Sequence, residues 1–177
     1  YLLENFGSKM DPDQKKFLKE KTFKGWDIVT EVVRLCAMNM YLHGIGSTES
    51  QIVAGDSLIS DPSDRFDIIM TNPPFGKKSS TIIFNEEGRA ERETLSYERD
   101  DFWTTSSNKQ LNFLQHVTTL LDENGRCSIV VPDNVLFEGG SGETVRQKML
   151  DLFDCHTLLR LPTGIFYAGG VKANVLF

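Results

Sequence analysis

The sequence predicts an α/β fold built on a doubly wound, mostly parallel sheet. Helical and strand-like segments alternate along its 177 residues, which is the pattern of such folds. Two predicted strands, residues 66–71 and 127–131, are apolar on both faces, as parallel strands covered by helices must be. Three polar residues that could bind a ligand, Asp27, Asp56 and Asn72, lie at the carboxyl ends of predicted strands. Ligands of these sheets bind beyond the carboxyl ends of the strands.

The first third of the chain is expected to contain three helical segments and two strands. Gly7 closes the first helix, and Asp11 with Pro12 opens the second. Apolar residues at helical spacing indicate that the third helix is buried. In order, the expected elements are a helix end at 1–6, a helix at 11–19, a strand at 22–28, a helix at 29–42 and a strand at 51–54.

Residues 76–108 separate the strand at 66–71 from the rest of the predicted sheet. They are polar and charged and lack clear periodicity, so we expect a long loop or mobile insert. The remaining expected elements are a helix at 110–121, a strand at 127–131, a helix at 142–153, a strand at 157–161 and a last strand from 172. We expect a single domain over residues 1–177 that carries this insert.

Composition and charge exclude several classes of protein. Hydrophobic residues make up 40% and charged residues 25% of the sequence, as in soluble globular proteins. The apolar runs are too short for a membrane span, the start lacks signal-peptide features, and three scattered cysteines favour reduced thiols. We therefore expect a cytoplasmic protein without a membrane or metal partner. The net charge of −6 is not typical of a protein that binds nucleic acid by itself.

The strongest functional motif is Asn72-Pro73-Pro74-Phe75, directly after an apolar strand. Asn-Pro and Pro-Pro also mark turns, but a turn explains neither this position nor the aromatic residue. An exocyclic aromatic amine is a poor nucleophile because its lone pair is delocalised. The Asn72 side-chain oxygen and the Pro73 carbonyl could accept both N–H bonds and free that lone pair. Phe75 could stack on a base flipped out of a duplex, with the amine in line with a sulfonium methyl group.

The ordered set of motifs resembles the modification subunit of type I restriction-modification systems. That resemblance implies a Rossmann-like S-adenosylmethionine-dependent methyltransferase fold, S-adenosylmethionine as cofactor, and methylation of the N6 amine of adenine in DNA. It also implies three partners: double-stranded DNA with a flipped adenine, a specificity subunit and a restriction subunit. The motifs are Arg34 to Gly44, Gly55-Asp56-Ser57-Leu58, Asn72 to Phe75, Gly125-Arg126 with Val131-Pro132, and Arg160 to Phe166.

The resemblance also implies which residues bind the cofactor. Asp27 is expected to accept hydrogen bonds from the ribose hydroxyls, and Ile28 to pack on the cofactor adenine. Asp56 is expected to accept a hydrogen bond from the adenine amine, with Ser57 and Leu58 lining that pocket. An acidic subunit fits this family because its DNA contacts are expected largely on a partner.

Each of these assignments has a simpler alternative. Asp27 could cap the helix that begins near Val29, and Asp56 could be an ordinary turn aspartate. Phe166 is expected to help hold the flipped base, but a core position is equally compatible with the sequence. The insert at 76–108 could be a DNA-facing lid or a solvated loop.

One family motif is absent from the sequence. In the family, this glycine-rich cofactor motif lies on the first strand and the turn after it, which would precede Tyr1. Gly139-Gly140-Ser141-Gly142 does not replace it, because these residues follow the strand at 127–131, the fifth strand of the family fold. The start at Tyr1 and the end at Phe177, inside a predicted strand, suggest a piece truncated at both ends. We expect it to bind cofactor weakly or not at all, and to be inactive alone. The strands ending at Asp27 and Thr71 would each keep an unpaired edge, which rearrangement or a second copy could close.

Two other classes of protein compete with this hypothesis. Methyltransferases of ribosomal RNA guanine amines and of protein glutamine amides use a similar tetrad, but the motifs outside it favour the DNA enzyme. A non-catalytic scaffold with a decayed site is the other alternative. The intact Asp56 and Asn72 argue against it.

Overall fold

The computed structural model describes residues 1–47, 50–76, 79–84, 90–166 and 170–177, with the backbone alone for 79–84 and 90–95. The chain divides into two compact units, Tyr1–Ser57 and Leu58–Phe177. No described helix combines the length and apolar character that a membrane crossing requires.

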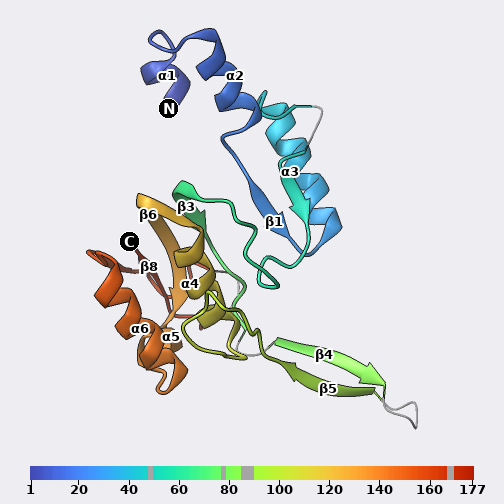
Figure 1. Cartoon of the computed structure of the whole chain (residues 1–177), viewed down its shortest axis with the longest axis vertical. Helices are drawn as coiled ribbons and strands as arrows, with labels where there is room; N and C mark the ends of the chain where they lie inside the picture. The colour runs from blue at the N-terminus through green and yellow to red at the C-terminus, as the bar shows by residue number, and fades with distance from the viewer. Residues whose placement is uncertain (48–49, 77–78, 85–89, 167–169) are drawn as a thin grey trace. The chain divides into compact units, whose positions relative to one another are not determined.

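The first unit contains three helices and a two-stranded parallel sheet (Figure 1). A capping box starts its second helix, because the Asp11 carboxylate accepts from the Gln14 N–H and the Gln14 side chain accepts from the Asp11 N–H. The first strand is shorter than the predicted 22–28, since its partner offers three residues for pairing. The elements are α1 (Leu2–Phe6), α2 (Pro12–Glu20), β1 (Gly25–Asp27), α3 (Thr30–Leu42) and β2 (Ile52–Ala54).

The second unit contains a four-stranded mixed sheet in the order β3-β6-β8-β7. β3 runs parallel to β6, and β8 runs antiparallel to both β6 and β7. Three of these four strands therefore share one direction, which confirms the predicted mostly parallel sheet with β8 as its exception. The strands are β3 (Phe66–Thr71), β6 (Leu121–Pro132), β7 (Leu158–Arg160) and β8 (Ala173–Leu176).

β6 begins at Leu121, earlier than the predicted strand at 127–131, and this added first half pairs irregularly with β3. Its pairing with β3 jumps from Phe66↔Leu121 to Ile68↔Arg126. Asn124 lies in this stretch with a φ of 60°, a left-handed conformation that asparagine tolerates better than most residues. Asn124 and Gly125 therefore lie within the strand, at its distortion.

Three helices of the second unit, α4 (Lys109–Leu120), α5 (Asp133–Phe137) and α6 (Ser141–Leu152), contribute to one apolar core with the sheet. The sequence did not predict α5, because five residues are too few to show a helical period. The core cluster comprises Leu111, Leu114, Val117, Ile129, Val131, Val135, Val145 and Met149.

The segment expected as a long loop at 76–108 contains an antiparallel hairpin, so that expectation was wrong. β4 (Ser79–Phe84) pairs with β5 (Ala90–Leu95) over six residues (Figure 1). The sequence AERETL of β5 has too few apolar residues to show a strand pattern, and backbone pairing does not need one. Residues 77–78 and 85–89 of the insert lie outside the described part. Its mobility stays a prediction.

Candidate active site

The Asn72–Phe75 motif follows β3 immediately, at the carboxyl end of that strand. Pro73 and Pro74 have no backbone N–H and so cannot continue the ladder. Pro73 is buried, whereas Asn72 is exposed, and no described residue forms a hydrogen bond with the Asn72 side chain. The prolines thus present an amide group at the end of a parallel strand with its oxygen available to a ligand.

Phe75 lies against Phe166, an aromatic residue from the segment between β7 and β8. Their ring centroids are 5.3 Å apart and their planes are inclined by 78°, a favourable edge-to-face arrangement. Both rings are half-buried. The structure therefore brings together two residues that sequence reasoning had assigned to base binding on separate grounds.

A cavity of about 370 Å³ lies beside this motif. It is lined by Phe75 and Gly76, by Gln110 of α4, by Asn134 of α5, and by Lys172 before β8, among others. A larger cavity of about 590 Å³, lined in part by Leu114, Met149 and Phe177, includes none of the predicted site residues. The smaller cavity is the one that the motif can use.

Asp133, at the first position of α5, anchors one wall of the smaller cavity. Its carboxylate accepts a hydrogen bond from Asn174 at 2.9 Å and two from Arg160 at 2.8 Å. The Asn174 hydrogen bond and the Arg160 guanidinium lower the pKa of Asp133 below its ordinary value. The start of α5 is thereby tied to β7 and β8.

The predicted cofactor residues Asp27, Ile28, Asp56 and Ser57 belong to the first unit. Asp27 ends β1, and its backbone carbonyl accepts from the Gly55 N–H at 3.0 Å. Asp27 and Asp56 therefore follow two adjacent parallel strands. Asp27 Oδ1 accepts from the Val29 N–H at 2.8 Å, as the helix-capping alternative expects, while Oδ2 bonds to no described residue. Ile28 is 70% exposed.

Leu58, the remaining predicted cofactor residue, begins the second unit and is 2% exposed. Its carbonyl accepts a 3.5 Å hydrogen bond from Arg99. Arg99 also donates to Asp101 at 2.9 and 2.6 Å and contacts His116 Nδ1 at 3.1 Å. A guanidinium only donates, so Nδ1 acts as the acceptor in this contact. The Arg99 side chain is 3% exposed.

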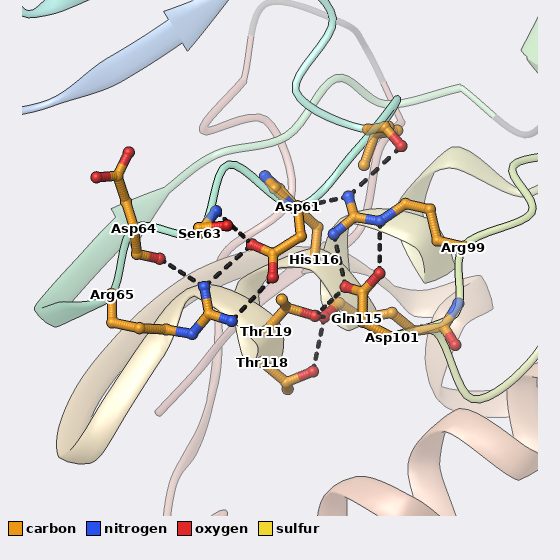
Figure 2. A network of polar contacts seen from close by, with 11 residues as sticks. Asp61, Ser63, Asp64, Arg65, Arg99, Asp101, Gln115, His116, Thr118 and Thr119 are labelled. Carbon is orange, nitrogen blue, oxygen red and sulfur yellow. Dashed lines mark hydrogen bonds and ion pairs between the residues drawn. The ribbon is translucent and has the colours of Figure 1, made fainter.

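Asp101 completes this network by accepting from the Thr119 hydroxyl at 2.5 Å. Burial raises the pKa of Asp101, but the hydrogen bonds from Arg99 and Thr119 outweigh burial and lower it below the ordinary value. A second pair, Arg65 with Asp61, lies nearby and is more exposed (Figure 2). The end of the insert is therefore tied to α4 and to the segment after Ser57.

Sequence reasoning missed these structural roles. Arg99 and Asp101 read as surface charges of a solvated insert, and nothing in a single sequence shows that the Arg99 side chain is buried while Asp101 is more exposed. Gln110 and Gln115 are both buried, in a helix that also carries the polar residues Asn112 and His116. Buried amides need hydrogen-bond partners.

None of the three cysteines lines the smaller cavity. The three cysteines are free thiols, and burial raises the pKa of Cys127 to about 11, which keeps that thiol protonated. Within the described ranges, no group of three or more His, Cys, Asp or Glu side chains is placed to hold a metal ion.

The strand order and the motif at the end of β3 define the class of protein as a methyltransferase-type α/β fold. A Listeria monocytogenes protein assigned to the class I S-adenosylmethionine-dependent methyltransferases aligns with a TM-score of 0.59 over 86% of this chain and 42% of that chain; its 14% identity supports the fold alone.

The chain belongs to the N-6 DNA methylase family, whose profile matches residues 2–177. It is 43% identical to the type I restriction enzyme StySPI methylase subunit of Salmonella potsdam over 173 residues, which cover 95% of this chain and 30% of that subunit. The crystal structure of the type I restriction enzyme EcoKI M protein aligns with a TM-score of 0.81 and 41% identity, covering 99% of this chain and 34% of that chain. The chain thus spans about 30% of the curated relative's length.

Proposed function

We propose that this chain is part of the catalytic domain of an S-adenosylmethionine-dependent DNA methyltransferase that modifies the N6 amine of adenine. The observation that carries the proposal is the Asn72–Phe75 motif at the end of β3, with Phe166 packed against Phe75. Family membership supports the same reaction. We place residues 1–177 in one catalytic domain of a modification subunit, with a specificity subunit, a restriction subunit and double-stranded DNA as partners.

Asn72 and Pro73 are the proposed catalytic acceptors. The Asn72 side-chain oxygen accepts one N6–H bond and the Pro73 carbonyl accepts the other, which localises the nitrogen lone pair. The two prolines stiffen the loop, so these acceptors are preorganised before the amine arrives. The amine proton can leave after attack, so the chain needs no general base beforehand. Phe75 and Phe166 hold the flipped base.

The residues after β1 and β2 fit the cofactor that this reaction needs. S-adenosylmethionine supplies the electrophilic methyl group when it is bound. Asp27 retains one carboxylate oxygen without a described partner for the ribose hydroxyls, and exposed Ile28 can pack on the adenine. Asp56 would accept a hydrogen bond from the adenine amine, and Ser57 and Leu58 would line that part of the cofactor site. The capping bond of Asp27 to Val29 is compatible with this role, because it uses the other oxygen.

Substitution of Asn72 by alanine in the full-length protein tests the reaction. Removal of one preorganised polar group at a reacting centre costs about 10²–10³-fold in rate, so we expect that loss in the methylation of DNA. Cofactor affinity should stay unchanged. Transfer from labelled S-adenosylmethionine measures the rate, and calorimetry measures the affinity.

A matched control is Asn5→Ala, which removes an exposed asparagine of α1 and should leave methylation intact. Offering DNA, RNA and protein to the wild-type protein separates the proposed reaction from its rivals. Transfer only to RNA or to protein would replace the substrate class, and no transfer to any of them would favour a scaffold. Asn72→Ala turnover within a few-fold of wild type would refute the role of Asn72.

A further inference from the structure

The cavity beside Phe75 contains a buried amide that the reaction does not yet use. Gln110 lines this cavity and is 5% exposed. It is the second residue of α4, and its backbone N–H donates to the capping side chain of Asn108 at 3.0 Å. This cap fixes the first turn of the helix, and with it the place of Gln110 beside the cavity.

A second glutamine of the same helix shows what a structural amide looks like here. Gln115 is 1% exposed. Its oxygen accepts from the Thr104 N–H at 3.0 Å, and its Nε2 donates to the Thr104 carbonyl at 3.1 Å. Both ends of the Gln115 amide are therefore satisfied by backbone, and they hold the end of the insert against α4.

The Gln110 side chain is satisfied at one end only. Its Oε1 accepts from Asn134 Nδ2 at 3.4 Å, which is a long hydrogen bond. Its Nε2 donates to none of the described residues. Nε2 is not fully enclosed, since Asn112 Oδ1 is the one fully buried polar side-chain atom without a partner among the described residues. Nε2 belongs to a residue that lines a cavity next to the catalytic loop. A ligand in the cavity would supply the missing acceptor.

We propose that Gln110 determines base specificity by donating from Nε2 to a ring nitrogen of the flipped adenine, and that Asn134 orients it through Oε1. The proposal rests on the proposed function and adds a residue to it. Adenine carries an acceptor on each side of its amine, N1 and N7. While Asn72 and Pro73 hold the N6 hydrogens, a donor beside them can reach one of these nitrogens.

The proposed contact also explains why guanine, which presents different hydrogen-bonding groups, would be rejected. Guanine has an oxygen in place of the N6 amine and an N–H in place of the N1 acceptor. It would leave the acceptors Asn72 and Pro73 without donors, and its N1–H would oppose the Gln110 donor if that donor addresses position 1. Unpaired polar groups in a closed site account for large losses of reaction with a wrong substrate.

The test uses the full-length protein assembled with its specificity subunit and a duplex that carries the sequence it methylates. The target adenine is replaced by 1-deazaadenine or by 7-deazaadenine, each of which has carbon in place of one ring nitrogen. For the wild-type protein we expect kcat/KM to fall about tenfold with one of the two, the worth of a neutral hydrogen bond. Gln110→Met should lose about tenfold on adenine itself and show no further loss with that analogue.

Gln115→Leu is the matched control, since it removes a buried amide from the same helix. It should lower the melting temperature but keep the wild-type ratio of kcat/KM between adenine and the analogue. If Gln110→Met does not fold, Gln110→Glu keeps the shape of the side chain while removing the donor. If the Gln110 variant kept the wild-type ratio of kcat/KM between adenine and the analogue, the proposal would be overturned.

Lys172 also lines the cavity and could donate in place of Gln110. If Lys172→Met, and not the Gln110 variant, abolished the difference in kcat/KM between adenine and the analogue, the contact would belong to that lysine and the proposal would be overturned. Failure of the proposed function gives a different result, because the wild-type protein would then transfer no methyl group to adenine in the duplex. In that case both proposals fall together.

Discussion

Helix α3 in the first unit and helix α4 in the second are nearly equal in length but differ in what they bury. Leu35 and Met38 of α3 are 67% and 63% exposed, whereas Leu111 and Leu114 of α4 are 0% and 2% exposed. Val33 is the one residue of α3 that the structure classes as buried. The second unit thus has a core of its own, while the apolar face of α3 has little to pack against within the first unit.

Both units contain a strand that is paired on one edge. Among the described strands, β1 pairs with β2 alone and β3 pairs with β6 alone, so each keeps one edge without a described partner. β6, by contrast, is paired on both edges. The residues at the carboxyl ends of these strands therefore have different supports. Asn72 follows β3, whose Ile69 packs against the core of the second unit although Ile68 and Met70 are exposed. Asp27 and Asp56 lie at or just beyond the ends of β1 and β2, which pair with each other over three residues.

The largest expected effect tests this difference in burial directly. Leu111→Ala should lower the free energy of unfolding by about 2–5 kcal/mol, because it removes a fully buried side chain and leaves a cavity. Leu35→Ala should change it by less than about 0.5 kcal/mol in the same chain, as exposed sites do. Urea denaturation followed by circular dichroism measures both. Equal losses would show that the surface of α3 is covered and would break the comparison.

Two arginine–aspartate pairs test how strongly burial affects the contribution of an ion pair to the stability of the second unit. Arg99→Met should cost about 1.5–3 kcal/mol of stability, because it removes hydrogen bonds to a charged group and leaves Asp101 with Thr119 as its other side-chain partner. Arg65→Met should cost less than about 1 kcal/mol, since exposed pairs contribute little. Melting temperatures of the two variants, measured side by side, give the contrast. A larger loss for Arg65→Met would contradict it.

The smallest expected effect concerns the first unit. Asp56→Ala in the full-length protein should weaken S-adenosylmethionine binding about tenfold, roughly the worth of one hydrogen bond to a charged group. Catalysis at saturating cofactor should change less. Calorimetry gives the affinity, and Asp67→Ala, which removes an exposed carboxylate of β3, serves as the control. Equal affinity of the Asp56→Ala and wild-type proteins would remove Asp56 from the cofactor site.

Local sequence patterns were sufficient for most elements and for the central motif. The capping residues Asp11 and Pro12, the apolar strand at Phe66–Thr71 and the prolines after Thr71 act over a few residues, so a linear reading can find them. The resemblance to the type I modification subunits, carried by ordered motifs along the chain, was confirmed by the family match. The hairpin of β4 and β5 escaped because its backbone pairing leaves no apolar signature.

The sequence by itself therefore determined the fold class, the order of most elements and the position of Asn72 at the end of a strand. Only the tertiary structure decided that Phe166 meets Phe75, that β8 lies between β6 and β7, and that Arg99 is buried against His116. It also distinguished Gln110 from Gln115, two identical residues five positions apart on one helix. The physical reason is that burial and hydrogen-bond satisfaction depend on segments distant in the chain, whereas periodicity, capping and turn chemistry depend on neighbours.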